Sequence, residues 1–128
     1  MVRQELTFHK NYDIASYKEY HDGILIEEIN YNKHGRIHGL YCKWYNNGNP
    51  SVLYHCVNGS AHGLCYNYYE NGQMESEVSY RDGKRNGVER KWYENGQMAS
   101  ECYFLDNKPT GLARGWLENG NYQYHYQH

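Results

Sequence analysis

The sequence predicts an all-β protein, an elongated single-layer antiparallel meander of about five stacked β-hairpins. Four Asn-Gly pairs place their glycines 24 residues apart, and a fixed period in this range indicates an array of one supersecondary unit. The composition is strongly polar, with a mean hydropathy of −1.05, and its apolar mass is mostly 16 Tyr, 3 Trp and 2 Phe. A thin sheet fits this composition, because Tyr and Trp bury their rings and keep their polar tips in water.

Three glycine columns share the 24-residue period. Asn-Gly between strand-like runs predicts a hairpin with a type I′ turn, which needs positive φ at both central residues. Counting outward from the turn at 71–72 pairs Tyr69 with Met74, Tyr68 with Glu75 and Gly63 with Tyr80. The same count pairs Asn67 with Ser76. The columns are Gly48, Gly72, Gly96 and Gly120; Gly39, Gly63, Gly87 and Gly111; and Gly35, Gly59 and Gly83, with Asn107 in the last copy.

A second turn is expected to join consecutive hairpins. Its clearest copy is residues 82–87, Asp-Gly-Lys-Arg-Asn-Gly, whose two glycines supply positive φ and close backbone approach. In the last copy Asn107 replaces the first glycine, and Asn is the next best residue for the left-handed conformation. Each repeat therefore contains one hairpin turn and one joint.

The chain divides into an extension and an array. Residues 1–11 form an N-terminal extension that admits a strand, a short helix or a frayed end. Residues 12–38 are a degenerate first copy with Asp22-Gly23 in place of Asn-Gly and one inserted residue before Gly35. Copies 39–62, 63–86 and 87–110 follow, and 111–128 is a truncated last copy. Atypical first and last copies are expected because terminal repeats cap an open stack. The five hairpins give a total of roughly ten strands.

The repeat carries a recognisable core. Residues 92–98 read Trp-Tyr-Glu-Asn-Gly-Gln-Met, residues 68–74 match with Tyr in first place, and residues 35–39 and 59–63 both read Gly-x-x-His-Gly. These residues resemble the MORN repeat, specifically its variant form, over about residues 12–128. The resemblance implies a curved MORN-type repeat array used for protein–protein contact, self-association or membrane phospholipid contact. Variant-type arrays also resemble antitoxins of bacterial toxin pairs, and the family implies no catalytic residue.

Two aromatic columns hold the candidate partner-binding residues. One places a large ring at the same point of every hairpin, and the other follows it on the opposite face. The rings either stack as a ladder, at about 0.2–1 kcal/mol per cross-strand pair, or bind a partner, because Trp and Tyr dominate interface hot spots. Both roles can hold in a one-layer sheet. The columns are Trp44, Tyr68, Trp92 and Trp116, and then Tyr45, Tyr69 and Tyr93, which would line a groove with Tyr54, Tyr80 and Phe104.

A modest basic cluster is the alternative site. It offers contact to anionic lipid headgroups, worth about 1 kcal/mol per charge near the surface, through Lys84, Arg85, Arg90 and Lys91. The net charge of −2 argues against nucleic-acid binding. The Gly-x-x-x-Gly turns lead into strands, so they lack the helix N-terminus that phosphate loops use. Open sheet ends expose unpaired backbone groups, so a homodimer is a further expectation, while the protein partner stays unidentified.

No cofactor, metal site or catalytic set is expected, so the protein is not expected to be an enzyme. His38 and His62 lie one repeat apart, roughly 10 Å, which is too far to share a zinc ion. Glu77 and Glu101 are separated by the same spacing and are expected on solvated faces. The four cysteines are expected to be small, half-buried packing residues; they are Cys42, Cys56, Cys65 and Cys102.

The expected location is the cytoplasm, or the host cytoplasm for a viral source. The first residues lack the apolar segment of a signal peptide. The longest purely aliphatic run is residues 24–26, far short of a membrane-spanning helix. Without a secretory signal, the cysteines are expected to be reduced thiols.

Overall fold

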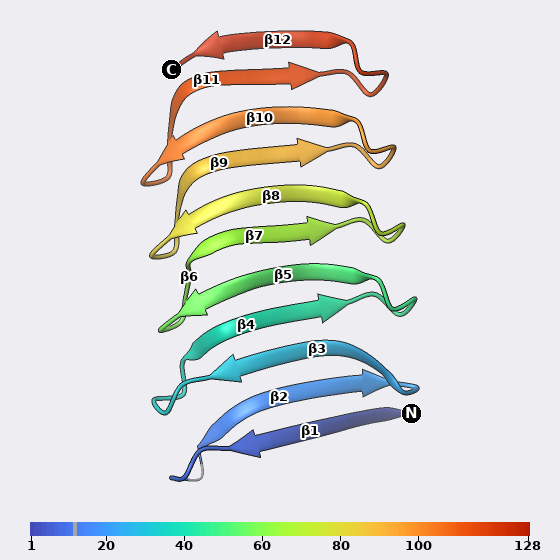
Figure 1. Ribbon diagram of the computed structural model, residues 1–128, viewed down its shortest axis with the longest axis vertical. Helices are drawn as coiled ribbons and strands as arrows, with labels where there is room; N and C mark the ends of the chain where they lie inside the picture. Colours follow the sequence, from blue (N-terminus) through green and yellow to red (C-terminus); the bar gives the residue numbers. More distant parts are fainter. Residues whose placement is uncertain (12) are drawn as a thin grey trace.

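A computed structural model describes residues 1–11 and 13–128, which form one open antiparallel sheet in which almost every strand pairs with its sequence neighbours (Figure 1). The small strand β6 pairs with β5 alone, and β7 takes the next place in the sheet. The strands are β1 (Val2–Phe8), β2 (Ile14–His21), β3 (Ile24–Tyr31), β4 (Ile37–Trp44), β5 (Pro50–Val57), β6 (Ser60–Ala61), β7 (Gly63–Tyr68), β8 (Met74–Arg81), β9 (Lys84–Trp92), β10 (Met98–Leu105), β11 (Lys108–Trp116) and β12 (Tyr122–Gln127).

The meander confirms the expected fold class, and two additional strands correct the expected count of about ten. The sheet has 12 strands. The two extra strands are the short β6 and the N-terminal β1, which pairs with β2 from Val2 opposite His21 to Phe8 opposite Ile14. Of the three conformations open for the extension, the strand is the one observed. The last strand, β12, has six residues against eight in β8 and β10, so the shortened C-terminal strand is confirmed.

The type I′ geometry expected at the Asn-Gly tips is found at joints instead. At 69–73 the N–H of Gly72 donates to the carbonyl of Tyr69, and φ is positive only at Gly72. This is a three-residue loop, a type I turn followed by a left-handed residue, so the type I′ prediction for Asn71-Gly72 is wrong. The type I′ geometry lies at the joint instead, where Asp82 and Gly83 have φ of 51° and 80° between the paired residues Arg81 and Lys84.

The longer loop shifts the strand register next to it. The predicted pairs from Gly63–Tyr80 to Asn67–Ser76 are confirmed. Beyond them a bulge pairs Tyr68 with Met74, so the predicted pairs of Tyr69 with Met74 and Tyr68 with Glu75 are wrong. The inserted residue before Gly35 is confirmed, because Asn32–Arg36 forms a three-residue loop in place of a two-residue turn.

The turns gather along two edges of the sheet (Figure 1). We call the connections after β2, β4, β7, β9 and β11 the tip edge, and those after β1, β3, β5, β8 and β10 the joint edge. Repeats are tied together at the joint edge by backbone bonds. The N–H groups of Gly59, Gly83 and Asn107 donate to carbonyls of the preceding repeat, those of Ile37, Ala61 and Arg85.

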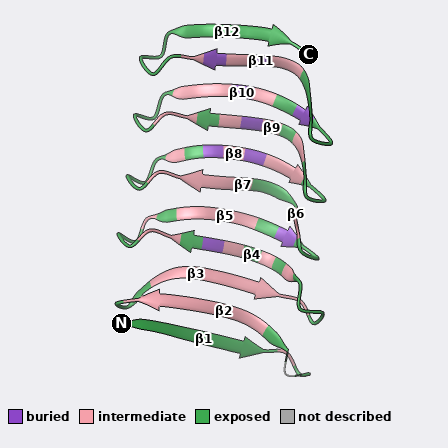
Figure 2. Ribbon diagram, turned by 180° about the vertical axis from the view of Figure 1, so that it is seen from behind, coloured by how far each residue is buried: buried purple, intermediate pink, exposed green. Residues whose placement is uncertain are grey.

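Burial is thin and confined to the middle strands, as a single-layer sheet requires (Figure 2). Directly paired residues share a face, and faces alternate along each strand. One face, the tryptophan face, carries Trp44, Trp92 and Trp116; the opposite face holds most of the buried side chains. The buried residues are Cys42, Cys56, Ser76, Val78, Glu89, Glu101, Phe104, Ala113 and Gly115. Strands β1 and β12 at the two ends are exposed throughout.

Candidate interaction surface

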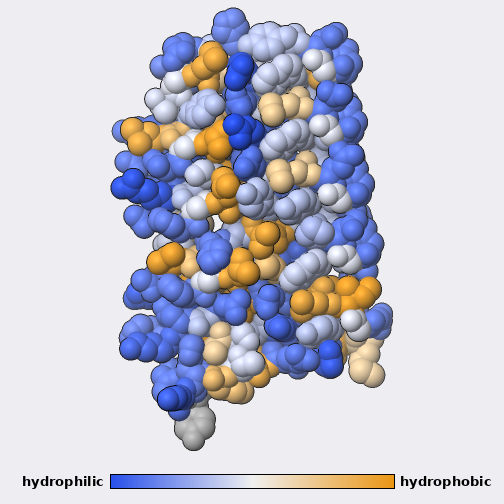
Figure 3. All heavy atoms as spheres, viewed as in Figure 1, coloured by the Kyte–Doolittle hydropathy of each residue, from blue (hydrophilic) through white to orange (hydrophobic). Residues whose placement is uncertain are grey.

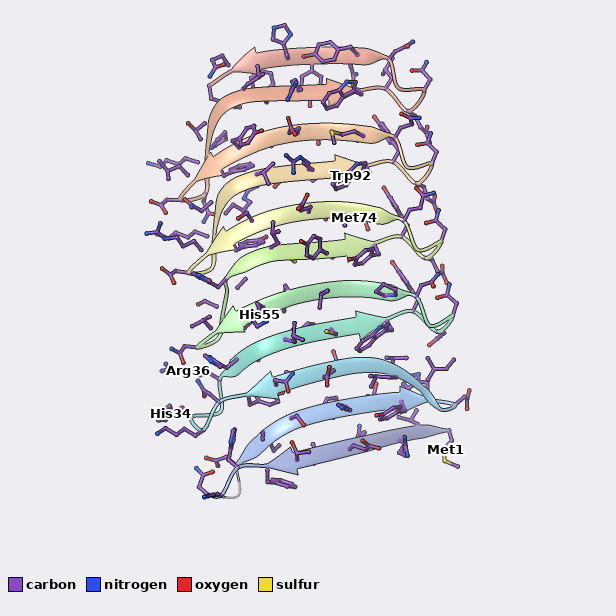
Figure 4. The ribbon with its side chains drawn as sticks, in the orientation of Figure 1. Met1, His34, Arg36, His55, Met74 and Trp92 are labelled. Atoms are coloured by element: carbon purple, nitrogen blue, oxygen red, sulfur yellow. The ribbon has the colours of Figure 1, made fainter. Side chains whose placement is uncertain are left out.

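A continuous stripe of rings and apolar side chains crosses the tryptophan face beside the tip edge. It arises because each of β4, β7, β9 and β11 ends at the tip edge with a Trp or Tyr. That aromatic residue pairs with the first residue of the next strand, which is Pro, Met or Tyr. We call this surface the Trp stripe; its residues, in order across the sheet, are Trp44, Pro50, Tyr68, Met74, Trp92, Met98, Trp116 and Tyr122. Figure 3 shows pale rings alternating with apolar groups there, and Figure 4 places Trp92 and Met74 toward the hairpin tips.

The rings of the stripe do not stack on one another. Proline or methionine separates the first four rings, and among the described residues no aromatic pair joins Trp44, Tyr68, Trp92 and Trp116 to each other. Only Trp116 packs on a ring within the stripe, edge-on to Tyr122 at 5.8 Å. The ladder interpretation is therefore wrong for this column.

The indole groups keep their hydrogen-bonding capacity. Across the part of the chain that the structure describes, no indole N–H donates to a protein acceptor, and no buried side-chain nitrogen or oxygen lacks a partner. The N–H groups of Trp44, Trp92 and Trp116 therefore face solvent. The rings themselves are half-buried, so each presents one apolar side and one polar donor.

The second aromatic column has a different role, which is to join repeats. Tyr45, Tyr69 and Tyr93 each donate a hydroxyl hydrogen bond to a backbone carbonyl 23 residues later. The acceptors are the carbonyls of Tyr68, Trp92 and Trp116, at 2.6, 2.7 and 2.7 Å. Leu117 occupies the equivalent position in the last hairpin of the sheet, where no following hairpin supplies a carbonyl. These tyrosine hydroxyls are committed to the fold.

Asparagines at the tip edge repeat this arrangement. The side-chain amides of Asn47, Asn71 and Asn95 donate to the carbonyls of Glu70, Glu94 and Glu118 at 2.8–3.0 Å. Each Asn also accepts the backbone N–H two residues later, at 2.9 Å. One side chain therefore closes its own turn and holds the next one.

We expect Tyr69→Phe to lower the free energy of unfolding by about 1 kcal/mol, because it removes one hydroxyl bond to a backbone carbonyl and leaves the ring. Tyr66→Phe is the control, since no hydrogen bond from the Tyr66 hydroxyl is formed among the described residues. Urea unfolding followed by tryptophan fluorescence measures both. Equal stabilities for the two variants would contradict the structural role of the tyrosine column.

A charge network lies beside the stripe on the tryptophan face. Arg90 bridges two carboxylates, with Nε 2.8 Å from Glu101 and Nη1 3.3 Å from Glu77, and Arg114 approaches the second oxygen of Glu101 at 2.5 Å. The hydrogen bond from Arg90, and then that from Arg114, lowers the pKa of Glu101. Glu101 is only 7% exposed, so its expected solvated position is wrong. The sequence signal was the alternation that places Arg90 between the two glutamates, and it was missed.

The four cations of the alternative lipid site are not brought together. Lys84 lies at the joint edge, and Arg85 bonds Glu89 and covers the ring of Phe104 at 4.0 Å. Arg90 is committed to the tryptophan-face network. Lys91 pairs with Ser76 and Ser100, and therefore points to the opposite face.

The opposite face is packed with Tyr and Cys. Tyr41 and Tyr54 stack at 4.8 Å, and burial raises the pKa of each to about 12. A shallow pocket of about 310 Å³ opens here, and its lining includes Tyr54 and Tyr80 of the expected groove; the full lining is Ile37, Tyr54, Cys56, Gly59, Ala61, Cys65 and Tyr80. A second pocket, of about 400 Å³, includes Tyr69 and Tyr93. Four of the expected groove residues therefore divide between two pockets, and Tyr45 and Phe104 line neither of them, so the single expected groove is wrong.

The four thiols are expected to react slowly with alkylating reagents. Burial raises the pKa of Cys42, Cys56, Cys65 and Cys102, and the thiolate is the reactive form. At neutral pH, iodoacetamide should label each one more slowly in the native protein than in urea, as followed by mass spectrometry. Cys42 and Cys56, the two buried thiols, should be slowest. Native labelling as fast as in urea would contradict their packing role.

His38 and His62 serve the joint edge. His38 Nδ1 accepts the N–H of Asn58 at 3.2 Å, and His62 Nδ1 lies 3.9 Å from Asp82. Within residues 1–11 and 13–128, no three His, Cys, Asp or Glu side chains converge as metal ligands. Over the same residues, no helix has the length and apolar character to cross a bilayer.

Comparison with known families agrees with this architecture. A model described as the MORN repeat variant matches two adjacent segments, residues 61–82 and 85–106. Each segment runs from the joint edge through one tip hairpin to the next joint, so the resemblance is confirmed for these two repeats. A comparison with curated proteins finds no match.

Proposed function

We propose that this array of MORN-type repeats is a non-catalytic protein-interaction module whose binding surface is the Trp stripe. The observation that carries the proposal is that the two aromatic columns differ in their hydrogen bonds. The hydroxyls of the tyrosine column donate hydrogen bonds to backbone carbonyls of the neighbouring repeat, whereas the three indole N–H groups have no protein acceptor among the described residues. MORN repeats bind proteins or membrane lipids, so the module class is supported by the matched segments.

The chemistry of the stripe suits a protein partner. Trp and Tyr contribute most of the binding energy at interfaces, and Met adapts its shape to irregular apolar surfaces. The stripe offers rings spaced by one repeat, roughly 10 Å. The Glu77–Arg90–Glu101 network supplies a polar border on one side. The partner expected here presents apolar side chains at a similar spacing, with backbone or side-chain oxygens that accept from the indoles.

The test compares capture of partners by three versions of the protein. Wild type, a Trp92→Ala/Trp116→Ala variant and a Tyr103→Ala control are used as bait with lysate of the native host. Tyr103 is 37% exposed and lies on the same face outside the stripe. A specific partner should be retained by wild type and the control, and should lose at least tenfold in affinity for the double variant, which corresponds to about 1.4 kcal/mol. Circular dichroism checks that the variant is folded.

One outcome would contradict the proposal, and others would favour the alternative functions. A partner bound equally by wild type and the stripe variant would place binding elsewhere and sink the proposal. The alternative of anionic phospholipid binding is tested with vesicles containing phosphatidylserine, where co-sedimentation should disappear at high salt. An antitoxin-like role would be indicated by a captured partner encoded beside this gene. The free thiols suit the reducing cytoplasm, which we propose as the location.

A further inference from the structure

The two long edges of the sheet carry opposite charge. We count each connection together with its two flanking strand residues. The tip edge then has four carboxylates and no Lys or Arg; they are Asp22, Glu70, Glu94 and Glu118. The joint edge has three carboxylates, Asp13, Asp82 and Asp106, against six cations; these are Lys10, Lys33, Arg36, Arg81, Lys84 and Lys108. The side chains of the edges therefore carry net charges of −4 and +3 within a chain of net charge −2, and the terminal amine beside Asp22 offsets one charge of the tip edge.

These charges are free to act outside the molecule. All six cations of the joint edge are exposed, and none forms an ion pair within the part of the chain that the structure describes. The same holds for Glu70, Glu94 and Glu118 of the tip edge, while Asp22 pairs with the terminal amine. By contrast, charges in the middle of the sheet, such as Arg90 and Glu101, are satisfied internally. The fold therefore leaves unpaired charge at its two edges.

The two edges also share one period. Tips and joints both recur once per repeat, so successive charges on either edge are spaced by two strands, roughly 10 Å. Glu70, Glu94 and Glu118 are themselves 24 residues apart, as are Lys84 and Lys108. The connection after β5 has no Lys or Arg, so in one register two of the three glutamates Glu70, Glu94 and Glu118 can face cations on another copy. Figure 4 places His34 and Arg36 on the joint edge, opposite the edge near which Trp92 lies.

We propose that this chain associates laterally with a second copy of itself, the acidic tip edge of one copy against the basic joint edge of the next. The low net charge produces little overall repulsion between copies, which favours such association. The contact is heterologous, so it repeats as an open ribbon rather than closing as a dimer. It leaves the Trp stripe uncovered on the face of the ribbon. This inference is independent of the proposed protein-binding function.

The experiment is sedimentation velocity of the full chain across protein concentration and salt. At about 10 mM salt, where the Debye length is about 30 Å, wild type should form dimers and larger species; at about 1 M, where it is about 3 Å, it should be monomeric. The tip-reversed variant Glu70→Lys/Glu94→Lys/Glu118→Lys has two basic edges and should stay monomeric. The joint-reversed variant Lys33→Glu/Lys84→Glu/Lys108→Glu has two acidic edges and should also stay monomeric.

Mixing the two reversed variants should restore association at low salt, which also shows that both are folded. A control, Glu5→Lys/Glu28→Lys/Glu75→Lys, has the same net charge as the tip-reversed variant but keeps both edges, and should associate like wild type. Monomeric wild type at low salt would overturn the proposal. So would loss of association in the control, or failure of the mixture to associate. Association that survives both high salt and edge reversal would also overturn it, and would point to pairing through β1 or β12.

Discussion

Gly87→Val is expected to lower the free energy of unfolding by about 3 kcal/mol. Gly87 lies in β9 opposite Phe104 with φ of +108°, a conformation that a β-branched residue adopts only with strain. That strain costs about 1–3 kcal/mol. A Cβ there would also lie 3.2 Å from the Cβ and Oγ of Ser79, so the neighbouring strand β8 must yield. Urea unfolding with tryptophan fluorescence measures the loss.

Gly63 is the matched control, because it occupies the same column one repeat earlier. Its φ is +90°, and nothing lies within 4 Å of a Cβ placed there. Gly63→Val should therefore show the backbone strain alone, about 1–2 kcal/mol. The difference between the two variants reports the contact with Ser79, and Ser79→Gly in the Gly87→Val background should recover part of it. Equal losses at the two glycines would show that β8 moves aside without cost.

Glu101→Ala is expected to cost about 2 kcal/mol at neutral pH. It removes the acceptor of two charged hydrogen bonds, from Arg90 and Arg114, and leaves a gap at a buried position. The two arginines are 33% and 41% exposed, so water compensates part of the loss, which keeps the figure below the sum of two such bonds. Glu101→Gln keeps the shape and one acceptor, and should cost less.

The same residue should make stability depend on pH. The pKa of Glu101 is lowered in the folded protein, first by the Arg90 hydrogen bond, so the folded state favours the carboxylate. This contribution is complete above the ordinary carboxyl pKa and is lost as pH falls through the lowered folded value. The stability difference between wild type and Glu101→Gln should therefore be largest near pH 7 and shrink below about pH 4. A difference that stays constant down to pH 3 would contradict the ion-pair network.

Local sequence predicted the strands well, because each hairpin is specified within its own 24 residues. The pairs from Gly63–Tyr80 to Asn67–Ser76 followed from counting outward from the turn. The turn geometry did not follow, since Asn-Gly and Asp-Gly both tolerate type I′ conformation. Asn71 forms the longer loop, in which its side chain bonds both Gln73 N–H and the carbonyl of Glu94 in the next repeat. That second bond needs a neighbour which the hairpin alone does not contain.

The candidate site was also predicted only in part from the sequence. Both aromatic columns were visible in the sequence as equivalent candidates, and the structure assigns the tyrosine hydroxyls at 45, 69 and 93 to joining repeats. The sequence showed one difference between the columns, because Leu117 stands in the tyrosine column while Trp116 continues the other column. For Glu101 the signal was partial, since strand alternation places Arg90 between Glu77 and Glu101, but the burial of Glu101 also depends on Arg114 from β11.

The sequence by itself determined the repeat, its hairpins, the alternation of faces and the all-β class, because all of these depend on residues close together in the chain. Tertiary structure decided which turn is tight, which aromatic column stays available and which charges remain unpaired at the edges. The physical reason is the one-layer sheet itself. With no second layer to cover them, side chains can be satisfied only by the strands beside them, and those strands belong to the neighbouring repeats.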